Sequence, residues 1–160
     1  MIFRFPEHSL APLFQITTGK KVVFTNGCFD LLHAGHVTYL KEAKELGEFL
    51  VLGLNSDSSI QRLKGPLRPI VSEMDRALIL SQLKSVDAVI LFSDDTPYEL
   101  IKALEPDVLV KGGDWKPDQI VGSDVVLAKG GLVTSLSYVE NHSTTDLITI
   151  IRSRYGVLDV

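Results

Sequence analysis

Two histidines, His33 and His36, stand where an apolar, β-branched segment gives way to a helical pattern. The run that contains them reads TNGCFDLLHAGH over residues 25–36, and Gly27 allows a sharp turn at the end of the expected strand. A helix that begins near Gly35 would present unpaired backbone N–H groups and its positive dipole end, with both imidazoles on one side. This combination favours a site for the phosphates of a nucleotide.

Two other interpretations of the histidine pair are weaker. Two histidines one turn apart can be an ordinary surface pair, but Gly27, Phe29 and Asp30 stand in register before them, directly after a strand. A zinc site would need a third histidine, cysteine or carboxylate at metal-site spacing, and the neighbouring sequence offers none. We therefore expect no metal ligands in this motif.

A second polar segment, KGGDW at residues 111–115, follows another apolar strand-like run. Its paired glycines let a ligand approach the backbone closely, while Asp114 and Trp115 can hydrogen-bond to and cover a sugar or a base. Taken alone, the segment would be a Gly-Gly turn beside a half-buried structural tryptophan. Its position after the fourth expected strand favours ligand binding, because ligands of such sheets bind beyond the carboxyl ends of the strands.

Two further segments supply cations and hydroxyls that suit phosphoryl transfer. Lys64 and Arg68 stand in residues 63–69, a segment that two prolines stiffen and that could close over a polyphosphate; a solvated surface loop is the alternative. Residues 143–145, STT, begin the last expected helix and offer hydroxyl and N–H groups to an anion. Ser143 could also be a plain N-cap, although the adjacent threonines favour a phosphate contact.

Strand-like and helix-like segments alternate along the chain, which predicts an α/β fold with a doubly wound parallel sheet. We expect five strands, at residues 21–25, 49–54, 88–92, 108–111 and 132–135. Helices are expected at 35–46, at 73–83 with Ser72 as N-cap, from Pro97 with Thr96 as N-cap, at 123–129 and after Ser143. Residues 1–20 are expected to form a helical or irregular N-terminal arm, and residues 21–160 a single domain.

Length and composition limit the class of protein. With 160 residues, 45% hydrophobic and 22% charged, the chain fits one soluble globular domain. Its net charge of −4 disfavours binding of duplex DNA or transfer RNA, which relies on Lys and Arg. The single cysteine, Cys28, excludes a disulfide framework and fits a reducing compartment. No apolar run reaches the roughly 18 residues of a membrane span, and no signal-peptide layout is present, so we expect a cytoplasmic protein with neither nucleic acid nor membrane as partner.

Residues 27–36 contain Gly-x-Phe-Asp-x-x-His-x-Gly-His, which resembles the signature of the cytidylyltransferase-like nucleotidyltransferase superfamily. LKGPLRP at 63–69, VKGGDW at 110–115 and STT at 143–145 look more narrowly like the D-glycero-β-D-manno-heptose 1-phosphate adenylyltransferases. The resemblance extends over approximately residues 20–152, nearly the whole chain.

The resemblance implies a Rossmann-like sheet with strand order 3-2-1-4-5, and transfer of AMP from ATP to heptose 1-phosphate. The products would be pyrophosphate and ADP-heptose, a precursor of the lipopolysaccharide core or another surface glycan. ATP is then the co-substrate, Mg²⁺ is carried largely on the polyphosphate, and a homodimer is expected. Many members are fused to a sugar kinase that this chain lacks, so a separate heptose kinase is expected upstream. Asn141 and His142 depart from the family's more frequent glycine and aromatic residue, which leaves this loop's contact with the nucleotide open.

The resemblance also implies roles for the motif residues. His33 and His36 are expected to bind the triphosphate, and Lys64 to stabilise charge in the transition state. Asp30, Arg68 and Trp115 are expected at the sugar phosphate, with Asp30 orienting that phosphate or a metal. The nucleotide-binding residues are expected to be Gly27, Cys28, Phe29, Gly35, Lys111, Gly112, Asp114, Ser143, Thr144 and Thr145. A cytidylyltransferase for glycerol phosphate or a similar small phosphate, and a non-catalytic nucleotide-binding module, are the alternative functions.

Overall fold

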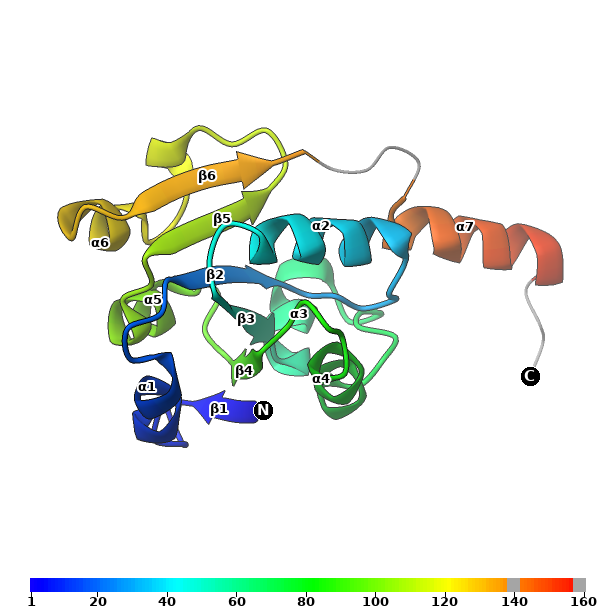
Figure 1. Ribbon diagram of the computed structural model, residues 1–160. Coiled ribbons are helices and arrows are strands. Elements are labelled where there is room, and N and C mark those ends of the chain that lie inside the picture. The colour runs from blue at the N-terminus through cyan, green and yellow to red at the C-terminus, as the bar shows by residue number, and fades with distance from the viewer. Residues whose placement is uncertain (138–141, 157–160) are drawn as a thin grey trace.

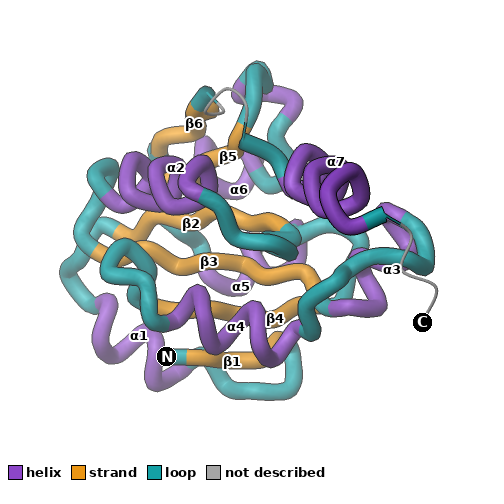
Figure 2. Tube along the Cα trace, turned by 90° about the vertical axis from the view of Figure 1, so that its right-hand side faces the viewer, coloured by secondary structure: helices purple, strands orange, loops and turns teal. Residues whose placement is uncertain are grey.

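The computed structural model describes residues 1–137 and 142–156, and within them six parallel strands form one sheet (Figure 1). The strands are β1 (Ile2–Phe5), β2 (Val22–Gly27), β3 (Phe49–Asn55), β4 (Ala88–Phe92), β5 (Val108–Gly112) and β6 (Leu132–Leu136). Figure 2 shows their spatial order, from β6 at the top through β5, β2, β3 and β4 to β1 at the bottom. The strands β2 to β6 are those expected from the sequence, in the expected order, which confirms the doubly wound α/β fold.

The first strand lies in a segment for which the sequence pattern predicts a helical or irregular arm. β1 pairs in parallel with β4, from Ile2 beside Val89 to Phe5 beside Phe92, so the expected number of strands was one too few. β1 has only four residues, most of them half-buried, and its own pattern is weak. Its hydrogen bonds to the open edge of β4 stabilise it, and such tertiary pairing is not readable from a local pattern.

The helices alternate with the strands. They are α1 (Ala11–Thr17), α2 (Ala34–Lys44), α3 (Asp57–Lys64), α4 (Glu73–Ser81), α5 (Tyr98–Leu104), α6 (Ser123–Ala128), α7 (Thr144–Tyr155) and the short 3-10 helix η1 (Pro117–Gln119). None of the helices in the described residues is both long and apolar enough to cross a membrane.

Serine side chains cap several of these helices. Ser72 and Ser143 each accept a hydrogen bond from the backbone N–H three residues on, which confirms both expected caps. Ser56 caps α3 in the same way, but the sequence pattern did not predict this short polar helix. The expected cap at Thr96 is wrong: α5 begins at Tyr98, and Pro97 occupies the N-cap position without a side-chain bond.

Both faces of the sheet are apolar and covered, as a parallel sheet requires. Because side chains alternate along a strand, Val22 and Phe24 pack in a core with residues of α1, α5 and α6, while Val23 packs with residues of α2 and α4. Gly53 in β3 lies beside Phe24; a Cβ there would be 2.7 Å from the Phe24 ring and 3.2 Å from the Cβ of Asn26. With Phe24 on the neighbouring strand, the central strands therefore fit together only with glycine at position 53.

Candidate active site

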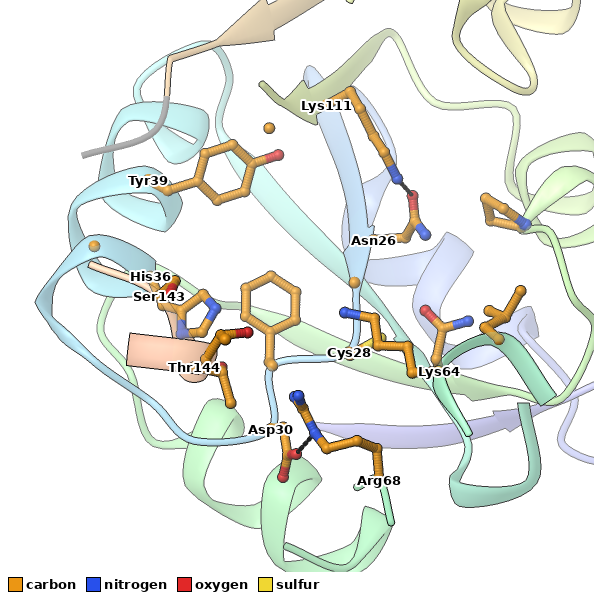
Figure 3. A pocket seen from close by; sticks show the side chains of 18 of the residues that line it. Asn26, Cys28, Asp30, His36, Tyr39, Lys64, Arg68, Lys111, Ser143 and Thr144 are labelled. Atoms are coloured by element: carbon orange, nitrogen blue, oxygen red, sulfur yellow. Dashed lines mark hydrogen bonds and ion pairs between the residues drawn. The ribbon is translucent and has the colours of Figure 1, made fainter. Parts of the chain in front are cut away.

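One cavity of about 800 Å³ opens where the loops after β2, β3, β4 and β5 meet the start of α7. Figure 3 shows side chains from these separate segments pointing into it, among them His36, Lys64 and Lys111. The cavity therefore brings together motifs that lie far apart in the sequence. It is lined by fifteen of the expected site residues: Gly27, Cys28, Phe29, Asp30, His33, Gly35, His36, Lys64, Arg68, Lys111, Gly112, Trp115, Ser143, Thr144 and Thr145. Asp114, also expected there, is exposed and is not among the lining residues.

The two histidines lie one above the other at the start of α2. His33 is the N-cap residue, and its Nδ1 accepts a hydrogen bond of 3.3 Å from the backbone N–H of His36. The two imidazole rings stack with their centroids 3.7 Å apart and an angle of 19° between them. The Phe29 ring lies 5.1 Å from the His36 ring, and Gly27 makes this possible, since a Cβ at Gly27 would be 2.8 Å from the Phe29 ring. The glycine and phenylalanine of the motif thus shape one wall of the histidine pair.

Burial lowers the pKa of both imidazoles, so that they accept a proton less readily than a histidine in water. Desolvation, followed by the neighbouring His33 and the Lys64 ammonium, lowers the pKa of His36 to about 4. Burial and the nearby His142 lower the pKa of His33, and Asp146 opposes them. The buried Nδ1 of His36 has no hydrogen-bond partner in the described part of the chain. At neutral pH His36 is therefore a neutral imidazole, able to donate one N–H to an anion.

Lys111 projects from β5 toward the end of β2. Its Nζ donates a hydrogen bond of 3.3 Å to Oδ1 of Asn26, as Figure 3 shows. Burial lowers the pKa of Lys111, Cys28 raises it, and the Lys64 ammonium lowers it. Lys111 of β5 and Lys64, the last residue of α3, thus face the same cavity, and the Lys64 ammonium makes the positive charge of Lys111 less favourable.

Asp30 is engaged with the chain itself. Its carboxylate accepts hydrogen bonds from Arg68 Nε at 2.7 Å and from the backbone N–H groups of Ile70 and Val71 at 2.9 Å each. Burial raises the pKa of this carboxyl, but the two backbone donors and the Arg68 guanidinium outweigh burial and hold the pKa below its ordinary value. Asp30 therefore anchors residues 68–71 and orients Arg68 at the cavity rim.

Gly35 lets the start of α7 approach the start of α2. A Cβ at Gly35 would lie 2.9 Å from the Cβ of His142 and 3.0 Å from Nδ1 of His33. His142, one of the two residues that depart from the family pattern, lines the cavity, and its ring centroid is 6.2 Å from that of His33. Asn141, the other departure, lies outside the described residues.

Several lining residues were not predicted. Three of them could have been identified from their position in the sequence, because Asn26, Asn55 and Thr96 lie at or just after the carboxyl ends of β2, β3 and β4. Tyr39 is less predictable, since its hydroxyl lies 2.6 Å from the Thr25 hydroxyl and only the packing of α2 on β2 brings them together. The additional lining residues include Asn26, Tyr39, Asn55, Leu63, Asp95, Thr96, Pro97, Gln119, Ile120, Val121, His142 and Asp146.

The carboxylates that line the cavity already have partners. Asp30 binds Arg68, Asp95 pairs with Arg62 at 2.8 Å, and Asp146 accepts from the Ser143 hydroxyl at 2.7 Å. The described residues contain no group of three or more His, Cys, Asp or Glu that could hold a metal ion. A magnesium ion in this cavity would depend mainly on oxygen ligands of a bound polyphosphate, which is how Mg²⁺ commonly binds at phosphoryl-transfer sites.

Comparison with known proteins agrees with this geometry. The chain is 58% identical to "Bifunctional protein HldE" of Syntrophotalea carbinolica over 86% of its length, and 57% identical to the protein of the same name from Magnetococcus marinus over 85%. It spans only 28% of the length of either relative. The crystal structure of a lipopolysaccharide core biosynthesis protein from Thermoplasma volcanium GSS1 is similar, with a TM-score of 0.61 and 31% identity, covering 78% of this chain and 100% of that one.

The sequence model of the family described as "Cytidylyltransferase-like" matches residues 24–150. That range begins in β2, ends in α7 and includes the histidine pair, Lys64, Lys111 and residues 143–145. The chain belongs to the cytidylyltransferase-like family.

Proposed function

We propose that this protein is an adenylyltransferase that transfers AMP from ATP to D-glycero-β-D-manno-heptose 1-phosphate, giving ADP-heptose and pyrophosphate. One observation carries the proposal: the histidine pair, Lys64, Arg68, Lys111 and the start of α7 line a single cavity. These are the segments whose sequences resemble the heptose 1-phosphate adenylyltransferases. The description of the Thermoplasma volcanium structure as a lipopolysaccharide core biosynthesis protein supports the same metabolic role.

The reaction needs no covalent intermediate with the protein. An oxygen of the sugar phosphate attacks the α-phosphorus of ATP, the bond from that phosphorus to the bridging oxygen breaks, and pyrophosphate leaves with the bonding electron pair. The protein's task is to align the two phosphates and to stabilise the negative charge that moves onto the leaving group.

The cavity provides donors for each part of that charge. Neutral His36 can donate an N–H to a phosphate oxygen, and Lys64 and Lys111 supply ammonium groups. The N-terminus of α7, with Thr144 and Thr145, adds backbone N–H groups and hydroxyls. Because His36 and Lys111 are partly shielded from water, these two donors act more strongly on developing charge than they would in bulk solution.

Magnesium is proposed to arrive with ATP. When bound, the ion neutralises charge on the phosphate oxygens of the nucleotide and its leaving group. No cage for it is formed by the described residues, so removing Mg²⁺ with EDTA should abolish transfer without unfolding the protein. Circular dichroism before and after chelation separates these two effects.

A pyrophosphate-release assay over a grid of ATP and CTP against heptose 1-phosphate and glycerol phosphate tests the proposed function. We expect release only with ATP and heptose 1-phosphate, and ADP-heptose as the sugar product by mass spectrometry. Faster release with CTP and glycerol phosphate would identify the cytidylyltransferase instead. Nucleotide binding without any release would identify a non-catalytic nucleotide-binding module.

The substrate itself predicts a preceding reaction. A sugar 1-phosphate is made by phosphorylating the anomeric hydroxyl, so we propose a separate heptose kinase as the metabolic partner. Because both steps use ATP, we place them in the cytoplasm. Co-expression of the kinase with this protein should restore ADP-heptose synthesis in a strain that lacks both activities.

We also propose that the protein is a homodimer. The groove between α4 and α7 is lined by Leu32, Ile79, Leu147 and Ile151, among others, and no residue of α7 is buried. The first turn of α4 is acidic and the last turn of α7 is basic, so two copies can meet with complementary charge. Light scattering should give the dimer mass, and Ile151→Asp should shift it to the monomer; a wild-type monomer would contradict the proposal.

A further inference from the structure

Arg76 is the largest fully buried side chain of the protein's described residues, with 1% of its surface exposed. Its guanidinium extends from α4 and donates hydrogen bonds to three separate segments, namely the loop after β2, the junction of β3 and α3, and the loop before α4. Nη1 donates to the carbonyl oxygen of Cys28 at 2.6 Å, and Nε donates to that of Val71 at 3.0 Å. Nη2 donates to the carbonyl oxygen of Asn55 at 3.0 Å and to Oδ1 of Asp57 at 2.7 Å.

Each of these loop segments leads to a residue of the candidate active site. Cys28 stands in the loop that connects β2 to the histidine pair. Asn55 and Asp57 form the entry to α3, whose last residue is Lys64. Val71 ends the segment anchored by Asp30, which carries Arg68. One planar guanidinium therefore fixes the relative position of the loops that carry the imidazoles, the ammonium and the second guanidinium of the cavity.

Stability alone does not explain a buried arginine here. Burying a guanidinium carries a large desolvation cost, and buried ion pairs can often be replaced by apolar residues without loss of stability. The neighbouring inward positions of α4, Ala77 and Leu80, are apolar and fully buried. A planar group with fixed donor directions does what no apolar side chain can do, because it ties several backbone carbonyl groups together in one geometry.

We propose that Arg76 is a positioning residue that holds the histidine loop, α3 with Lys64, and residues 68–71 in the arrangement needed for AMP transfer. Arg76 itself does not line the cavity and touches no reacting atom. The catalytic consequence rests on the proposed function; the structural consequence, a fixed loop at Cys28, does not.

The first experiment compares Arg76→Lys with Lys44→Met. Arg76→Lys keeps the positive charge but its compact ammonium cannot reach all three loops. Lys44 is a matched control: it also pairs with a carboxylate, Asp87, and donates to the carbonyl of Glu48, but at the opposite end of the sheet. We expect Arg76→Lys to lower kcat about 100-fold with a smaller change in the KM for ATP, because misplaced catalytic groups lose interactions in the transition state. Lys44→Met should leave kcat within about twofold, as expected for a change remote from the reacting groups.

The second experiment reads out the loop without any substrate. Cys28 is the single cysteine, so the rate of its alkylation by iodoacetamide reports on this loop alone. We expect Arg76→Lys to raise that rate at least fivefold at a temperature where both proteins are folded, and Lys44→Met to leave it unchanged. If Arg76→Lys does not fold, Arg76→Gln, which keeps amide donors without the buried charge, carries the same comparison.

The results separate the possible failures. An unchanged kcat in Arg76→Lys would overturn the positioning role. The role would also be overturned if Arg76→Lys lost only as much stability as Lys44→Met and its Cys28 were alkylated at the wild-type rate. If the wild-type protein forms no ADP-heptose but Arg76→Lys still speeds alkylation, the proposed function fails while the structural part of the inference stands.

Discussion

The two walls of the cavity differ in how completely their polar groups are paired. On one wall, Asp30 accepts bonds from Arg68 and two backbone N–H groups, and outside the cavity lining the fully buried Arg76 donates to four oxygen atoms of the segments that form this wall. On the other wall, burial lowers the pKa values of His36 and Lys111, and Nδ1 of His36 has no partner in the described residues. The paired wall is the scaffold; the other wall has donors that a bound polyphosphate would satisfy.

The largest expected effect comes from the unpaired wall. His36→Ala should lower kcat at least about 100-fold with a smaller change in ATP affinity, because its charge stabilisation is strongest in the transition state. Steady-state kinetics against both substrates measures the two effects separately. Val37→Ala, at an exposed position of the same helix, is the control, and a His36→Ala variant with near-normal kcat would remove His36 from the mechanism.

Breaking the paired wall should instead lower stability. Asp30→Asn leaves the Arg68 guanidinium and two backbone donors without a carboxylate, which should cost about 3 kcal/mol of unfolding free energy at pH 7. The folded-state pKa of Asp30 is lowered, so its contribution is present above the unfolded value and is lost as the pH falls through the folded one. Urea titrations should therefore show the difference between wild type and Asp30→Asn shrinking below about pH 4. An equal difference at pH 7 and pH 3 would contradict this assignment.

The segment between Lys64 and Val71 connects an exposed part of the chain to the backbone groups that Asp30 binds. The protection of its amide groups tests whether only the exposed part closes over a ligand. The N–H groups of Ile70 and Val71 are bound to Asp30 in the absence of ligand, whereas Leu67 is 88% exposed. Hydrogen exchange should show the N–H groups of Ile70 and Val71 protected in the free protein, and the N–H of Leu67 protected only after ATP and sugar phosphate bind. Equal exchange of the Leu67 N–H with and without ligands would argue against a closing loop.

The lowered pKa of His36 predicts a pH dependence of folding. The folded value is about 4, below the ordinary value of 6.5, so the unfolded state takes up this proton first as the pH falls. The free energy of unfolding should therefore decrease between pH 6.5 and pH 4, and His36→Gln should reduce that slope. The pKa of half-buried His33 is shifted in the same direction, so some slope should remain in the variant. An unchanged slope in His36→Gln would show that His36 does not titrate in this range.

Cys28 should give the smallest effect of a direct substitution. It lines the cavity, yet no thiol chemistry enters the proposed transfer, so Cys28→Ser should remain substantially active. A bulky adduct on its sulfur would project into the cavity proposed to bind the nucleotide, so alkylation should inactivate the wild type and saturating Mg-ATP should slow that loss. Inactive but folded Cys28→Ser would point to a thiol role, and alkylation unaffected by Mg-ATP would contradict the placement.

The sequence predicted the features that depend on local pattern and on the geometry of parallel sheets. Apolar runs predicted the strands β2 to β6, and N-cap residue types predicted the serine caps of α4 and α7. The rule that ligands bind beyond the carboxyl ends of parallel strands predicted the convergence of the segments that contain His33, Lys64 and Lys111. β1 was missed because pairing with β4 stabilises it, and α3 because its short polar sequence has little periodicity.

Within the site, the pairing of polar groups was less predictable than their presence. Asp30 was expected to orient a sugar phosphate or a metal, but its partners are Arg68 and two backbone groups that the sequence places about 40 residues away. The burial of Arg76 in α4 and its hydrogen-bond partners were likewise not predicted, because a charged residue in an amphipathic helix is usually on the solvent side. Partner choice depends on tertiary geometry, which no local pattern contains.

Gly53 leads to an expectation about evolution. Its missing side chain leaves room for the ring of Phe24, and Asn26, two residues further along β2, holds Lys111 through its side chain. A side chain at position 53 would push on both neighbours, so descendants of this sequence that acquire alanine or serine there should also carry a smaller residue at position 24. Substitutions at positions 24 and 53 should therefore be correlated among related sequences. Such a correlation would show that the packing of β2 on β3, and with it the position of Lys111, has been maintained.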